Sequence, residues 1–82
     1  MVSKPKVTLY TRRGCCLCED VKEVLLAAQS RAAFDYEEFD IDADEELCEL
    51  YNEDVPVVTI DGKKAFKHRV EMTDFLKRLA RR

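Results

Sequence analysis

Three of the four cysteines in this 82-residue chain fall within four consecutive positions, Cys15-Cys16-Leu17-Cys18. Cys15 and Cys18 form a Cys-x-x-Cys motif where an apolar strand pattern gives way to helical periodicity. A spacing of one helical turn lets the two sulfurs approach closely enough to bond. The first sulfur also lies beside the unpaired N–H groups of a helix start, whose partial positive charge favours thiolate over thiol. The leading hypothesis is therefore thiol–disulfide exchange, with Cys15 and Cys18 as the catalytic pair.

Such exchange needs one thiolate that attacks a disulfide and a second thiol that releases the product. We expect Cys15, which precedes the helix, to be the exposed sulfur, and Cys18, one turn inside, to be more buried. Arg12 and Arg13 would add positive potential near Cys15, so both are candidate substrate-binding residues. Cys16 is predicted to fill a variable position, because adjacent cysteines rarely reach relaxed disulfide geometry.

Other interpretations of the motif remain open. Half of a zinc site is one, but Cys16, Cys48 and His68 supply no second ligand pair at zinc-finger spacing. A second is a binding module in which Cys15, with Cys16 and glutathione, holds an iron–sulfur cluster or another soft metal. A third is an interaction domain that keeps the fold and is redox-inert. Cys48 itself is predicted to be a small, half-buried hydrophobe, and His68 to lie at the surface.

Four segments have the composition of strands. The second of them, Phe34–Ile41, mixes acidic and aromatic residues, which is typical of an outer strand. The segments are Lys6–Thr11, Phe34–Ile41, Val57–Ile60 and Lys63 to about Lys67. A helical segment joins the first two, which should therefore be parallel with a right-handed crossover. Asp61-Gly62 is a two-residue hairpin signal that makes the last two antiparallel. The strands predict a mixed four-stranded sheet.

Three segments repeat apolar residues at helical spacing, which completes the order β-α-β-α-β-β-α and predicts an α/β fold with three helices flanking the sheet. The first helix begins near Cys16, and the second is capped by Asp42 or Asp44 and runs to about Asn52. In such sheets reactive groups gather at the carboxyl ends of parallel strands, where Cys15 lies. Positions expected to face the core are Leu17, Val21, Val24, Leu25 and Ala28, then Leu47, Leu50 and Tyr51, and finally Met72, Phe75, Leu76 and Leu79.

The length, charge and hydropathy of the chain exclude several classes of protein. Eighty-two residues predict a single domain spanning positions 1–82. A net charge of −3 and an isoelectric point near 5.1 argue against general nucleic-acid binding. The sequence has neither an apolar run near the roughly 20 residues that span a bilayer nor the apolar core of a secretory signal. We expect a cytoplasmic monomer without membrane association. In the reducing cytoplasm, a Cys-x-x-Cys motif is more often catalytic or metal-binding than structural.

Several segments together carry a resemblance to a known family. They are the strand Val7–Tyr10, the loop Thr11–Gly14, the motif Cys15–Asp20, and Val55-Pro56 ahead of a strand and an Asp-Gly hairpin. On these residues the chain resembles the thioredoxin-like superfamily, and most closely its small, uncharacterised glutaredoxin-like branch. The resemblance covers nearly the whole chain and implies a thioredoxin-like fold.

Carried over position by position, the resemblance implies that Cys15 is the nucleophile and Cys18 the resolving thiol. It further implies that Pro56 is a cis-proline facing the motif and that Val55 offers backbone hydrogen bonds to a bound peptide or glutathione. The implied partner is a disulfide-containing protein or glutathione as co-substrate, with no bound cofactor or metal. Classical glutaredoxins carry a Gly-Gly pair after the last strand, and the corresponding stretch Phe66–Val70 has none.

Overall fold

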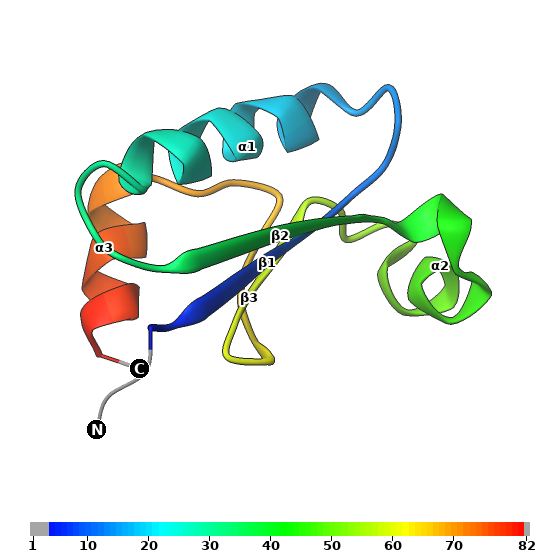
Figure 1. Ribbon diagram of the computed structural model, residues 1–82. Coiled ribbons are helices and arrows are strands. Elements are labelled where there is room, and N and C mark those ends of the chain that lie inside the picture. Colours follow the sequence, from blue (N-terminus) through cyan, green and yellow to red (C-terminus); the bar gives the residue numbers. More distant parts are fainter. Residues whose placement is uncertain (1–3, 82) are drawn as a thin grey trace.

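The computed structural model describes residues 4–81, which form four strands and three α-helices in the predicted order (Figure 1). The strands are β1 (Lys6–Thr11), β2 (Asp35–Asp40), β3 (Val57–Ile60) and β4 (Lys63–Lys67). The helices are α1 (Cys16–Ala28), α2 (Glu45–Tyr51) and α3 (Met72–Ala80), and a short 3-10 helix, η1 (Ile41–Ala43), precedes α2. No helix within the described residues is long and apolar enough to cross a bilayer.

The sheet has the strand order β2-β1-β3-β4. Strands β1 and β2 are parallel, whereas β3 is antiparallel to both β1 and β4. The hairpin turn uses Asp61 and Gly62 at φ 53° and 85°, the left-handed conformation that this dipeptide adopts readily. This arrangement confirms the mixed four-stranded sheet and the α/β thioredoxin-like fold. It also explains the polar composition of β2, which lies at an edge of the sheet.

Helices α1 and α3 pack on the same face of the sheet and enclose the main core (Figure 1). Phe34 and Phe75 meet edge to face there, with ring centroids 5.4 Å apart. Each fully buried side chain of this kind contributes about 1.5–3 kcal/mol through removal of apolar surface from water. The buried core residues include Val7, Leu9, Val21, Leu25, Ala28, Val58, Ile60, Val70 and Leu79.

Helix α2 covers only the end of the opposite face, where the Tyr51 ring lies 4.8 Å from that of Tyr10. No residue of α2 is buried, and Leu50 is 64% exposed, so the prediction that Leu50 faces the core is wrong. Successive helical residues are about 100° apart, and contact through Tyr51 turns Leu50 towards solvent. Asp44, one of the two predicted caps, accepts hydrogen bonds from the backbone N–H groups of Glu46 and Leu47.

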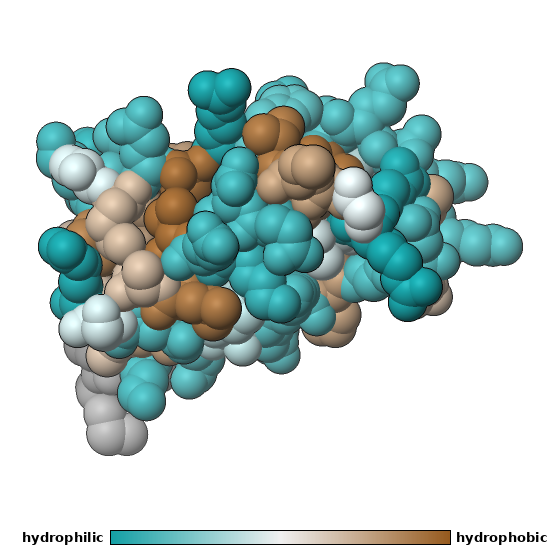
Figure 2. Space-filling view, turned by 90° about the horizontal axis from the view of Figure 1, so that it is seen from above, coloured by the Kyte–Doolittle hydropathy of each residue, from teal (hydrophilic) through white to brown (hydrophobic). Residues whose placement is uncertain are grey.

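The α1 side of the molecule keeps some apolar surface (Figure 2). Val21, Leu25 and Ala28 are buried as predicted, but Leu17 is 39% exposed. Leu17 belongs to the first turn of α1, at the motif end, where the helix extends past the main core. The expectation for Leu17 is therefore wrong, and this residue is available to a ligand near Cys15.

Candidate active site

Cys15 is the N-cap residue of α1. Its φ and ψ of −89° and 111° are extended, and its Sγ accepts a hydrogen bond from the backbone N–H of Cys18 at 3.2 Å. Gly14 precedes it with φ 80°, a conformation that favours glycine. The turn is closed by the backbone N–H of Cys15, which donates to the Arg12 carbonyl at 3.2 Å. The loop thus holds a half-buried sulfur against the free N–H groups of a helix start.

Cys18 is buried, with only 2% of its surface exposed. Burial raises the pKa of the Cys18 thiol, and the contact with Cys15 raises it further, against an opposing effect of the Thr11 hydroxyl and the Arg12 backbone. The expected contrast between an accessible Cys15 and a buried Cys18 is therefore present. Thr11, which the sequence did not single out, is part of this environment because β1 ends beside the first turn of α1.

Two hollows border the motif. One, of about 350 Å³, lies towards β2, and both Cys18 and Arg13 line it. An ion pair between Lys22 and Glu38, with Nζ and Oε1 3.2 Å apart, lines the same hollow. The other, of about 410 Å³, lies between α1 and the segment before α3, and its lining residues are Leu17, Asp20, Val21, Val24, His68, Arg69, Val70 and Glu71. The motif therefore has polar groups on one side and a partly apolar groove on the other.

The peptide bond between Val55 and Pro56 is cis, as the resemblance implies. Pro56 is buried, and its carbonyl accepts a hydrogen bond from the His68 backbone N–H at 2.8 Å. The Val55 N–H donates to the Tyr51 carbonyl at 3.2 Å, so the structure already uses the amide that was expected to serve a ligand. The Val55 carbonyl accepts no hydrogen bond from the described residues.

The Arg12 side chain was expected to lie beside Cys15, but its hydrogen bonds go to Asp42 and Asn52. Its Nε and Nη2 donate to the Asp42 carboxylate at 3.0–3.2 Å, and its Nη1 and Nη2 donate to the carbonyl and side-chain oxygens of Asn52. The bonds to Asp42 hold the pKa of Arg12 above its ordinary value. Arg12 therefore ties the end of β1 to the residues on both sides of α2, whereas Arg13 remains exposed.

The remaining cysteines and the histidine differ in their surroundings. Cys16 is exposed. Cys48 is half-buried, but its neighbours are polar: its Sγ lies 3.5 Å from Arg12 Nη2 and 3.9 Å from Asp42 Oδ1. His68 is exposed, with a left-handed backbone at φ 69°. Within residues 4–81, no group of three or more His, Cys, Asp or Glu side chains is placed to hold a metal ion.

Comparison with known sequences gives a consistent family. The profile described as "Glutaredoxin-like domain (DUF836)" matches residues 6–80. A glutaredoxin-like protein of Dictyostelium discoideum is 37% identical over 71 residues, covering 79% of this chain and 66% of that protein. An uncharacterised protein of Mycobacterium tuberculosis is 34% identical over 68 residues, covering 77% of this chain and 70% of that protein. The chain thus spans about two thirds of the length of these relatives.

Comparison with solved structures supports the same assignment. A Nitrosomonas europaea protein solved by NMR has 30% identity and a TM-score of 0.80, covering 95% of this chain and 94% of its own. An X. campestris protein has 29% identity and a TM-score of 0.77, covering 93% and 97%. A malaria-parasite thioredoxin-2, at 15% identity and a TM-score of 0.77, shares the fold, covering 100% and 86%. The chain belongs to the glutaredoxin-like domain family of thioredoxin-fold proteins.

Proposed function

We propose that this protein is a thiol–disulfide oxidoreductase that cycles between a Cys15/Cys18 dithiol and a Cys15–Cys18 disulfide. The observation that carries the proposal is the position of Cys15 Sγ at the N-cap of α1, 3.2 Å from the Cys18 backbone nitrogen. Helix-start N–H groups stabilise the attacking thiolate, and the second thiol lies within the same turn. Because burial raises the pKa of Cys18, that residue rests as a thiol while Cys15 reacts.

The exchange has two steps. The Cys15 thiolate attacks one sulfur of a substrate disulfide, forms a mixed disulfide with it and expels the other substrate sulfur as a thiolate. Cys18 then gives up its proton and attacks Cys15 Sγ, which closes the Cys15–Cys18 disulfide and releases the second substrate thiolate. Two electrons pass from the protein to the substrate, and an external thiol reductant restores the dithiol.

An extended disulfide substrate, either a protein segment or glutathione, is proposed to bind between the motif and the Val55-Pro56 segment. The Val55 carbonyl offers one backbone acceptor beside the cis-proline Pro56. Arg13 is an exposed cation next to the motif, and Leu17 adds apolar contact. Arg13, Val55 and Pro56 are therefore proposed to bind substrate, whereas Arg12 is proposed to hold the loop in position.

Trapping of the mixed disulfide tests the proposal. The variant Cys18→Ser, treated with glutathione disulfide, should retain a stable glutathione adduct on Cys15, whereas the unchanged chain should pass on to the internal disulfide. Cys15→Ser should form neither product, and Cys16→Ser and Cys48→Ser serve as matched controls that should behave as the unchanged chain. Peptide mass spectrometry locates the adduct. An adduct formed mainly on Cys16 or Cys48 in the unchanged chain would overturn the assignment.

A second measurement separates exchange from metal binding. An iron–sulfur cluster held through Cys15 gives the freshly purified protein visible colour, with iron and acid-labile sulfide in stoichiometric amounts. We expect a colourless protein with neither element above background. Stoichiometric iron that disappears in Cys15→Ser would favour the binding-module interpretation instead.

A further inference from the structure

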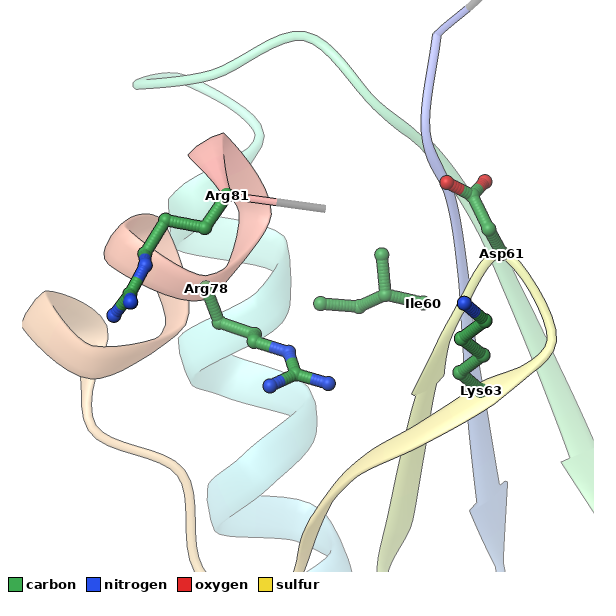
Figure 3. A pocket seen from close by; sticks show the side chains of 5 residues that line it. All are labelled: Ile60, Asp61, Lys63, Arg78 and Arg81. Carbon is green, nitrogen blue, oxygen red and sulfur yellow. The ribbon is translucent and has the colours of Figure 1, made fainter.

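A pocket of about 390 Å³ opens between the β3–β4 hairpin and the last turn of α3. Figure 3 shows the residues that line it: Ile60, Asp61, Lys63, Arg78 and Arg81. Ile60 pairs with Val7 at the start of β1, whereas Cys15 follows the end of β1. The pocket therefore lies at the end of the sheet remote from the dithiol and is separate from the proposed exchange site.

The cations of this pocket have no acidic partner. Within residues 4–81, Lys63, Arg78 and Arg81 take part in no ion pair, although five ion pairs link other cations to carboxylates. Among the described residues, Asp61 is the one acid that lines the pocket, and its carboxylate accepts a hydrogen bond from the Lys6 backbone N–H at 3.0 Å. Three cations and one carboxylate in the described part of the chain thus line the pocket, which leaves it net positive in a chain whose net charge is −3.

Arg78 and Lys63 line the pocket from opposite walls. Arg78 extends from α3 towards the hairpin that carries Lys63, with the apolar Ile60 between them, whereas the Arg81 guanidinium lies on the other side of α3 (Figure 3). The helix dipole favours a cation in the last turn of α3, but it does not account for Lys63, which lines the same pocket from the hairpin with its side chain running towards Asp61 (Figure 3). Two cations that line one hollow repel each other unless an anion lies between them.

We propose that this pocket binds the phosphate group of a small, soluble phosphate ester. The guanidinium of Arg78 presents a planar fork that matches phosphate oxygens in pairs, and Lys63 adds a point charge from the opposite wall. Ile60, 5% exposed, forms an apolar floor between the two cations, against which the carbon side of an ester would lie. The ligand class is therefore an organic phosphate monoester.

An NMR titration of the full chain tests this proposal, with methyl phosphate as the probe and ionic strength held constant with chloride. We expect saturable amide shifts confined to the Ile60–Lys63 turn and the last turn of α3. Arg78→Gln removes a paired, charge-assisted contact and should weaken binding about tenfold or more. The double variant Lys63→Gln/Arg78→Gln should abolish saturation.

The double variant Lys64→Gln/Lys67→Gln is the matched control, because it removes the same charge from cations that contact Asp54 instead. It should leave the affinity for methyl phosphate within about twofold, since its charges lie outside the pocket. Equal weakening in both double variants, or shifts that spread over the surface without saturating, would overturn the proposal. Binding to phosphatidylglycerol vesicles without saturable binding of methyl phosphate would also overturn it and indicate a lipid surface.

Discussion

Replacement of Cys15 separates its structural role from its chemical one, because the same sulfur caps α1 and is proposed to attack the substrate. Loss of an N-cap side chain to alanine typically costs about 1 kcal/mol, within a range of roughly 0.5–2 kcal/mol. Sulfur is a weak acceptor and Cys15 is only half-buried, so Cys15→Ala should lie near the lower end, at about 0.5–1 kcal/mol. In a domain of this size that loss lowers the Tm by about 2–8 °C.

Cys15→Ser is the informative partner variant. Serine is a preferred N-cap residue, so its hydroxyl should keep the bond to the Cys18 N–H and hold stability within about 0.5 kcal/mol of the unchanged chain. Both variants should lose thiol–disulfide exchange, and Cys16→Ala, at the exposed next position, should change neither property. Urea unfolding under reducing conditions gives the stabilities. Equal stability of Cys15→Ala and Cys15→Ser would refute the capping role, and exchange that survives Cys15→Ser would refute the catalytic one.

Three further outcomes follow from the burial and contacts of single residues. Burial raises the pKa of Cys18 above the value of about 8.5 for an unfolded cysteine, so its stabilisation of the reduced protein is complete below about pH 8.5 and is lost as the pH rises through the folded pKa. Unfolding measured from pH 7 to 10 should show this decline, and a decline of the same slope in Cys18→Ala would contradict it. The Tyr36 hydroxyl is buried without a partner among the described residues, and burial raises its pKa to about 12. Tyr36→Phe should therefore raise the free energy of unfolding by about 1 kcal/mol, whereas a fall of that size would show that the hydroxyl is satisfied. Arg12→Gln should speed amide hydrogen exchange in α2 and leave Cys15 alkylation unchanged, with exposed Arg13→Gln as the control; unchanged exchange in α2 would rule out the clamp.

The elements that position the dithiol could be predicted from short-range patterns. Strand β1 and the Asp61-Gly62 turn depend on residues adjacent in sequence, and both formed where expected. Cys15 and Cys18 could be assigned because one helical turn places them together whatever the rest of the chain does. The cis form of Pro56 came from the family resemblance, since most X–Pro bonds are trans.

The role of Arg12 could not be predicted, because its partners Asp42 and Asn52 are 30 and 40 residues away in sequence. An arginine beside a thiol motif suggests positive potential near the thiol. Only the packing of α2 against the end of β1 shows that the Arg12 guanidinium is already paired with the Asp42 carboxylate. Leu50 is a related case. Its apolar type predicted burial, but α2 contacts the sheet through too narrow a strip to cover it.

A redox titration of the reduced protein against defined mixtures of glutathione and glutathione disulfide tests the central claim most directly, with peptide mass spectrometry identifying the bond that forms. We predict one intramolecular disulfide between Cys15 and Cys18, formed in a single two-electron transition at roughly −270 to −120 mV. A protein that stays fully reduced across this range, or that instead links Cys15 to Cys16, would contradict the assignment of these two sulfurs as the exchange pair.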